Sequence, residues 1–207
     1  MVKVKICGIT NLEDALHAVK EGSDALGFMF YRRSPRYINP LRAKSIIECI
    51  PKDIIKIGVF VNSDRKRVLR IANLCHLDML QFHGDESASY CNKFRGYKVI
   101  KAFRVKDKVR EDLLLRYKVF AYLFDAYTKS RFGGTGKHFD WKLVRHLGKL
   151  NNPVFISGGL NQKNVLRAIA IAKPHWIDIS SSLESEPGRK DHLKVSRFLK
   201  RVKSLKR

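Results

Sequence analysis

The sequence places a thiol and a carboxyl group directly after short apolar runs, where strand ends are expected. Cys7 follows V-K-V-K-I, and Asp125 follows V-F-A-Y-L-F. A thiolate can act as a base, and a partly desolvated carboxyl group can act as an acid. Together they predict proton-transfer chemistry if the fold brings them to one ligand. The alternatives are a small buried apolar role for Cys7 and a turn or capping role for Asp125.

Glycine and serine clusters after two later apolar runs point to anion binding. S-G-G-L-N at 157–161 contains Gly158 and Gly159, and D-I-S-S-S at 178–182 contains Ser180 and Ser181. Glycine lets backbone N–H groups approach a ligand, and a helix N-terminus adds the positive end of a dipole. These loops predict a phosphate site, with a tight turn and an N-cap as the alternative.

Other side chains with chemical potential lie near the ends of further apolar runs. Arg36, in R-R-S-P-R-Y, offers a planar fork suited to a carboxylate. His83 and Asp178 have hydrogen-bonded structural roles as alternatives. The G-G-T-G-K of 133–137 is not a P-loop, because His138 follows its lysine, so we expect a loop that closes over a ligand. No His, Asp, Glu or Cys set has metal-ligand spacing, which predicts no metal.

The elements that must position these groups alternate between strand and helix patterns. The predicted strands are 2–6, 25–30, 55–61, 77–82, 98–103, 119–124, 153–157 and 176–180. The predicted helices lie near 11–21, 40–50, 64–75, 86–94, 107–115, 140–148, 161–172 and 188–203. Asn11, Asp64 and Asn161 stand at expected N-caps.

Eight β–α units predict a parallel sheet closed into a (β/α)8 TIM barrel. An open doubly wound sheet is the competing fold, but it usually has fewer strands, and no G-x-G-x-x-G follows the first strand. The sequence has no linker, so we expect a single domain over 1–207. In such a barrel the carboxyl ends of strands 1 and 6 lie three places apart around the ring. Cys7 and Asp125 are therefore expected to face each other across the mouth.

The formal net charge of +23 is high for a chain of 207 residues. Such a field attracts anions of any kind, including RNA and phosphorylated metabolites. The basic residues are mostly scattered, and no stacking-aromatic or helix-turn-helix pattern accompanies them, so we expect no specific nucleic-acid partner, only weak, salt-sensitive polyanion binding. No apolar run reaches membrane-spanning length, and the four cysteines show no disulfide or metal pattern. We expect a reduced, cytoplasmic monomer without membrane contact.

The ordered set of motifs resembles the phosphoribosylanthranilate isomerase family. The matching segments are K-I-C-G-I-T, G-F-M-F-Y-x-x-S-P-R-Y, Q-F-H-G-D-E, L-F-D-A…G-G-T-G-K-x-F-D-W, I-S-G-G-L-N and D-I-S-S-S-L-E…P-G-x-K-D. They run from residue 3 to about 198. The resemblance implies an Amadori rearrangement of N-(5'-phosphoribosyl)anthranilate in tryptophan biosynthesis, without a cofactor.

The same resemblance implies a role for each candidate. Asp125 would be the general acid and Cys7 the general base. Arg36 would hold the anthranilate carboxylate, with His83 and Asp178 near the substrate. The phosphate would be bound by the remaining candidates, which are Gly158, Gly159, Ser180 and Ser181.

One residue departs from the family pattern, and two other functions stay open. Ser182 stands where the family commonly has glycine, and its side chain could narrow the phosphate loop or add a hydroxyl contact. One alternative function is another sugar-phosphate isomerase or epimerase barrel, although those rely on metal ligands or paired aspartates. The other is a non-catalytic polyanion-binding barrel, which only the net charge favours.

Overall fold

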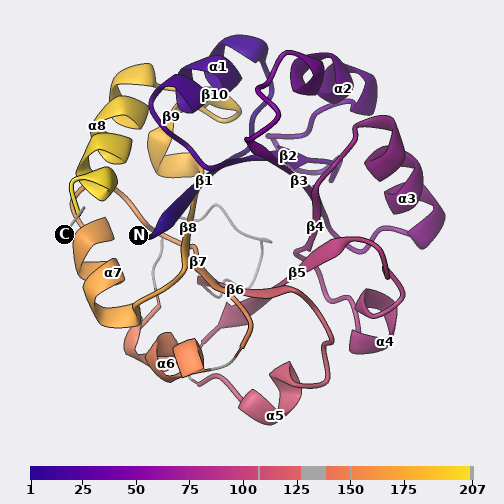
Figure 1. The fold of residues 1–207 in the computed structure, drawn as a ribbon, viewed down its shortest axis with the longest axis vertical. Coiled ribbons are helices and arrows are strands. Elements are labelled where there is room, and N and C mark those ends of the chain that lie inside the picture. Colours follow the sequence, from indigo (N-terminus) through magenta and orange to yellow (C-terminus); the bar gives the residue numbers. More distant parts are fainter. Residues whose placement is uncertain (107, 127–138, 150, 206–207) are drawn as a thin grey trace.

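A computed structural model gives the fold and describes residues 1–106, 108–126, 139–149 and 151–205. The parallel strands close into a barrel in the order β1 to β8, with β8 pairing back to β1 and the helices outside (Figure 1). The strands are β1 Lys3–Cys7, β2 Ala25–Met29, β3 Ile55–Phe60, β4 Met79–Phe82, β5 Lys98–Val105, β6 Ala121–Ala126, β7 Val154–Ile156 and β8 Trp176–Ile179. The predicted (β/α)8 barrel is therefore confirmed.

The helices are α1 Leu12–Lys20, α2 Pro40–Glu48, α3 Arg65–Leu74, α4 Ala88–Cys91, α5 Glu111–Leu114, α6 Lys142–Arg145, α7 Val165–Ala172 and α8 His192–Lys203. Polar side chains cap the first turns of α1, α2, α3, α4 and α8. Asn11 accepts from the Asp14 N–H at 2.8 Å, and Asp64 accepts from the Arg67 N–H at 2.8 Å, so both predicted caps are confirmed.

The predicted cap at Asn161 is wrong, because α7 begins four residues later with Asn164 at the N-cap position. Asn161 instead accepts from the backbone N–H groups of Lys163 at 2.8 Å and Asn164 at 3.2 Å. It therefore shapes a separate turn between β7 and α7. Leu160 separates this turn from the glycines of the candidate phosphate loop.

The predicted helix over 188–203 is also too long at its start. A short antiparallel hairpin, β9 (Glu184–Glu186) and β10 (Arg189–Lys190), precedes α8. Gly188 has a φ of +87° in its turn, a conformation that glycine adopts without steric cost. Asp191 then accepts from the Lys194 N–H and begins α8. The hairpin matters because it adds two charged side chains to the barrel mouth.

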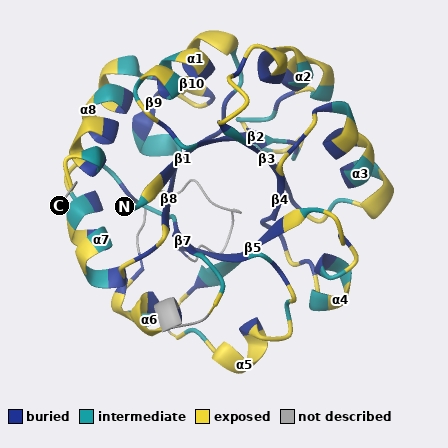
Figure 2. Cartoon of the chain, viewed as in Figure 1, coloured by how far each residue is buried: buried dark blue, intermediate teal, exposed yellow. Residues whose placement is uncertain are grey.

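The buried apolar side chains form two layers, one between the strands and the helices and one inside the barrel. Figure 2 shows the strands of the barrel mostly buried and the exposed residues mainly on the surrounding helices and loops. The inner layer is apolar at the amino-terminal half of the barrel, where Phe155 and Trp176 stack with ring centroids 4.9 Å apart. Its members are Ala25, Ile57, Met79, Ile100, Ala102, Ala121, Leu123, Phe155 and Trp176. Nearer the carboxyl ends the interior becomes polar, with Lys5, Gln81 and Asp178 buried together.

The outer surface carries helices that are short and amphipathic. Among the described residues, no helix is long and apolar enough to cross a membrane.

Candidate active site

The candidate base lies at the carboxyl end of β1 and is buried. Cys7 is 7% exposed, and burial raises the pKa of its thiol above the ordinary value. Lys5 lies two residues earlier on the same face of β1, and its ammonium group lowers the pKa of the thiol by favouring the thiolate. Asp178 opposes ionisation, while Lys190 supports it. The resting group is therefore a thiol, held beside a positive charge that can stabilise the thiolate.

The candidate acid lies at the carboxyl end of β6 and is 2% exposed. The Ala126 N–H donates to Asp125 Oδ1 at 2.9 Å. Asp125 Oδ2 lies 3.1 Å from Nε2 of His83, which follows β4. These two contacts, one to each oxygen, orient the carboxyl group of Asp125. His83 is therefore a direct neighbour of the candidate acid.

The closed strand order puts the two candidates at the same end of the barrel. β1 and β6 are separated around the ring by β8 and β7, as predicted. Because all strands are parallel, their carboxyl ends share one rim, where barrel active sites lie. Cys7 and Asp125 therefore occupy strand ends three places apart on the same rim.

Arg36 is held by a carboxylate that the sequence motifs did not single out. Its Nε lies 2.8 Å from Glu184 Oε1 and its Nη2 lies 2.6 Å from Glu184 Oε2. Lys190 Nζ contacts Glu184 Oε1 at 2.8 Å, so the carboxylate has two cationic partners. Burial disfavours the charge of Glu184, but the two cations prevail and lower its pKa. This pairing uses one edge of the guanidinium and leaves the Nη1 edge to face another acceptor.

A second buried ion pair fixes the loop that contains His83. Lys101 Nζ lies 2.8 Å from Glu86 Oε2 and 2.7 Å from the Gly84 carbonyl oxygen. Glu86 also accepts from the backbone N–H groups of Asn62 at 2.8 Å and Gly84 at 2.9 Å. The loops after β3 and β4 are thereby joined to β5. This arrangement holds the backbone next to His83 in place.

The loops after β7 and β8 bring the candidate phosphate ligands to the same rim. Gly158 and Gly159 have φ values of +80° and +62°, which suit glycine. Ser180 Oγ donates to the Cys7 carbonyl oxygen at 2.9 Å, so this loop contacts the candidate base. Within the described ranges, the backbone N–H groups of Gly158, Gly159, Ser180 and Ser181 donate to no protein acceptor. Such N–H groups can bind an anion.

Ser182, the departure from the family pattern, connects these two loops. Its Oγ donates to the Leu160 carbonyl oxygen at 2.6 Å. The added hydroxyl therefore makes a contact between the loops. The G-G-T-G-K segment of 133–137, for which a closing loop was predicted, lies outside the described residues.

Four further residues complete the polar rim: Lys5, Gln81, Glu184 and Lys190, which lie inside the quoted family motifs but to which the sequence analysis gave no role. A signal for Lys5 was present, since alternation in a strand puts it on the same face as Cys7. Glu184 ends the D-I-S-S-S-L-E motif, but its partner could not be predicted, because the contact with Arg36 spans 148 positions of sequence. Among the described residues, no group of three or more His, Cys, Asp or Glu could hold a metal ion.

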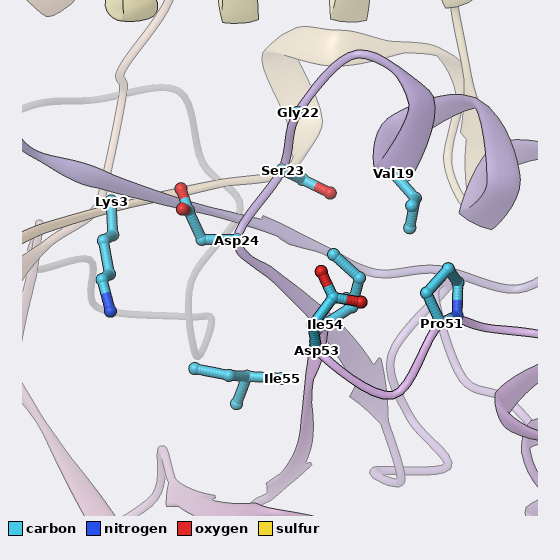
Figure 3. A pocket seen from close by; sticks show the side chains of 9 residues that line it. All are labelled: Lys3, Val19, Gly22, Ser23, Asp24, Pro51, Asp53, Ile54 and Ile55. Atoms are coloured by element: carbon cyan, nitrogen blue, oxygen red, sulfur yellow. The ribbon is translucent and has the colours of Figure 1, made fainter.

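A cavity of about 370 Å³ lies at the other end of the barrel (Figure 3). It is lined by Lys3, Val19, Gly22, Ser23, Asp24, Pro51, Asp53, Ile54 and Ile55. These residues precede or begin the strands, whereas barrel chemistry occurs at the carboxyl ends. Asp24 accepts from the Val4 N–H and from Lys203 Nζ, each at 2.8 Å, so it is used structurally.

The closed barrel, with a thiol and a carboxyl group on its carboxyl-end rim, belongs to the class of (β/α)8-barrel isomerases. The family model described as N-(5'phosphoribosyl)anthranilate (PRA) isomerase matches residues 4–201. The chain belongs to this N-(5'-phosphoribosyl)anthranilate isomerase family, as the motifs predicted.

Individual relatives agree with this assignment. The chain is 48% identical over 205 residues to an N-(5'-phosphoribosyl)anthranilate isomerase of Geotalea uraniireducens, covering 99% of this chain and 100% of the relative. The phosphoribosyl anthranilate isomerase structure from Thermotoga maritima is 42% identical, with a TM-score of 0.90 over 99% of this chain and 100% of that one. Another solved isomerase of this name, in complex with reduced 1-(o-carboxyphenylamino)-1-deoxyribulose 5-phosphate, is 40% identical, with a TM-score of 0.86 and coverage of 99% and 100%.

Proposed function

We propose that this chain converts N-(5'-phosphoribosyl)anthranilate into 1-(2-carboxyphenylamino)-1-deoxyribulose 5-phosphate, a step of tryptophan biosynthesis. Asp125 is the general acid and Cys7 the general base. One observation carries the assignment: the two groups lie on one rim of a closed barrel in a chain of this family. The solved relative in complex with a reduced product supports a phosphorylated, carboxylated small-molecule substrate.

The proposed reaction needs one proton donated and one removed. Asp125 gives its proton to the furanose ring oxygen, the bond from C1 to that oxygen breaks, and a protonated Schiff base forms. The Cys7 thiolate then removes the proton from C2, and that electron pair makes the C1–C2 double bond of an enolamine. The enolamine tautomerises to the ketone by losing the O2 proton and gaining one at C1. Asp125 regains its proton and Cys7 loses one before the next turnover.

The remaining candidates hold the substrate in this proposal. The Nη1 edge of Arg36 binds the anthranilate carboxylate, opposite the edge that Glu184 occupies. The N–H groups of Gly158, Gly159, Ser180 and Ser181 bind the phosphate. His83, bound to Asp125, and Asp178, whose buried Oδ1 has no partner among the described residues, contact the reacting part.

The decisive experiment follows the fluorescence of phosphoribosylanthranilate, generated in situ, as purified protein is added. Turnover should occur, and Cys7→Ser and Asp125→Asn should each reduce kcat by at least about 100-fold, the scale for loss of a positioned acid or base. Cys49→Ser is the matched control, because Cys49 is an exposed thiol at the end of α2. Near-normal turnover in either rim variant would contradict the assignment.

We further propose that the chain works as a cytoplasmic monomer and as a single domain. The exposed large apolar side chains are spread over α1, α2, α5, α8 and the two ends of the chain, which supports a monomer. One solved structure from Thermotoga maritima is described as generated monomers of a dimeric isomerase of this kind. Sedimentation equilibrium of this chain distinguishes the two states, and one cooperative unfolding transition is expected for one domain.

A further inference from the structure

A lysine ammonium lies inside the barrel between the proposed base and the proposed acid. Lys5 is 0% exposed, and its Nζ donates to Gln81 Oε1 at 2.6 Å and to Asp178 Oδ2 at 3.0 Å. The Cys7 thiol is its neighbour on the same face of β1, and the positive charge of the ammonium favours the thiolate form of Cys7. The ammonium is thereby surrounded by residues of the rim.

The packing explains why the ammonium and the thiol are adjacent. A Cβ atom on Gly27, the β2 residue that pairs with Cys7, would lie 2.7 Å from Cys7 Sγ and 2.8 Å from Lys5 Cε. The space that a side chain of β2 would fill is thus occupied by these two residues. The missing side chain at Gly27 therefore makes room for the contact.

The same ammonium determines how Gln81 and His83 are oriented. A lysine ammonium only donates, so the Gln81 atom that faces it must be the carbonyl oxygen. The Gln81 amide nitrogen then faces His83 Nδ1 at 2.9 Å and donates to it. His83 Nδ1 consequently carries no proton, and Nε2 carries the proton that is donated to Asp125 Oδ2 at 3.1 Å.

We propose that Lys5 is a positioning residue for both halves of the reaction. It stabilises the thiolate form of Cys7 and, through Gln81, fixes the neutral His83 tautomer that donates to Asp125. This inference rests on the proposed function for its catalytic meaning. It adds to that function a charged group that touches neither the acid nor, in the proposed reaction, the reacting carbon atoms.

The other charges around Cys7 do not replace Lys5. From the hairpin, Lys190 also favours the thiolate, but its Nζ is held by Glu184 at 2.8 Å and burial lowers its pKa. From β8, Asp178 disfavours the thiolate. The pKa of Lys5 is raised, because Asp178 and Cys7 together outweigh the effect of its burial. Lys5 therefore stays charged whenever the thiol is to ionise.

The first test measures thiolate formation directly, by absorbance at 240 nm during a pH titration. Subtracting the Cys7→Ser version of each protein isolates Cys7 from Cys49, Cys75 and Cys91. In Lys5→Met the Cys7 titration should move to higher pH, with roughly tenfold less thiolate at a given pH. Lys3→Met is the matched control, because it removes one charge from the same face of the same strand. An unmoved Cys7 titration in a folded Lys5→Met protein would overturn the proposal.

The second test needs no substitution at Lys5 and so survives a failure of that variant to fold. Histidine ¹⁵N spectra of the wild type, with His83 identified by its absence in His83→Gln, report the tautomer. We expect a protonated Nε2 and an unprotonated Nδ1 at neutral pH. A proton on Nδ1 would overturn the orientation derived from Lys5.

Kinetics separate this inference from the proposed function. Lys5→Met should lower kcat at least about tenfold while KM changes little, because Lys5 acts on Cys7 rather than on the substrate. If the titration moves but even the wild type does not isomerise the substrate, the proposed reaction is wrong and the effect on Cys7 stands. If the wild type turns over and Lys5→Met keeps its kcat, the role of Lys5 is refuted.

Discussion

Replacing Gly27 with alanine tests the geometry of the rim more sharply than removing a functional group. The new methyl group would lie 2.7 Å from Cys7 Sγ and 2.8 Å from Lys5 Cε. Optimal contacts between such atoms are about 3.5–4.0 Å, so both atoms must move by most of an ångström relative to the new methyl group. The Lys5 ammonium is anchored to Gln81 and Asp178, so the larger displacement is expected at the thiol.

The size of the effect follows from that displacement. A misplacement of about 1 Å in a reacting group costs about 100-fold in rate, or about 2.7 kcal/mol in activation free energy. Overpacking of a core costs about 1–3 kcal/mol in unfolding free energy. For a chain of this length that corresponds to a decrease in Tm of about 2–12 °C. We therefore expect Gly27→Ala to fold, with a large loss in kcat and little change in KM.

The assay combines substrate fluorescence with thermal unfolding, and Gly58→Ala is the control. Gly58 lies on the neighbouring strand β3, and its added Cβ would lie 2.4 Å from Leu77 Cδ1, away from the rim. Gly58→Ala should thus lower Tm in the same way and retain kcat. If folded Gly27→Ala keeps kcat within about twofold of the wild type, the position of Cys7 beside Lys5 does not govern the reaction.

Three further results are expected. Gly158→Asp should weaken the binding of a phosphate-bearing product analogue, and it should also lower kcat because its Cβ would lie 2.6 Å from Asp125 Oδ1; equal affinity by calorimetry would place the phosphate elsewhere. Raising the ionic strength from 0.01 to 0.1 M shortens the Debye length from about 30 to about 10 Å and screens the attraction between the charge of +23 and an anionic substrate. We therefore expect kcat/KM to fall while kcat stays nearly constant, and weak inhibition by RNA to vanish near physiological salt. A salt-insensitive kcat/KM would mean that the charge does not assist substrate capture. Burial raises the pKa of Glu184, but Arg36 and Lys190 outweigh it and lower that pKa. The stability that ionised Glu184 gives the folded protein is therefore complete above the ordinary carboxyl pKa and is lost as pH falls through the folded value. The Tm difference between wild type and Glu184→Gln should shrink between pH 6 and 3, and a constant difference would refute the coupling.

The sequence predicted the barrel because its signals are local. Each strand is a short apolar run, and it is followed by a segment whose apolar residues recur with the period of a helix. The observed strands lie within the predicted ranges, except that β1 ends one residue later and β5 and β6 end two residues later than predicted. Once the ring closes, the rim position of Cys7 and Asp125 follows from strand order alone. The proposed acid and base could therefore be assigned to one rim without any contact being known.

The partners of these groups could not be predicted in the same way. The Arg36–Glu184 pair and the Lys5–Asp178 pair join residues 148 and 173 positions apart, and no local pattern encodes such distances. The β9–β10 hairpin was also missed, because S-E-P-G-R-K resembles a polar approach to a helix and not a strand pair. It is this hairpin that brings Lys190 to Glu184.

A buried ammonium inside a barrel needs a reason, because removing it from water costs several kcal/mol unless its N–H groups are all paired. At Lys5 the ammonium donates to Gln81 and Asp178 and lies beside the Cys7 thiol, and each of these residues faces the rim or leads to it. An apolar residue at position 5 would fill the barrel interior in the same way as the apolar inner layer does at the amino-terminal half. The polar half of the barrel is therefore better understood as part of the reaction chemistry than as part of the core. Its charge sets the ionisation of the thiol on one side and the orientation of the imidazole beside the acid on the other.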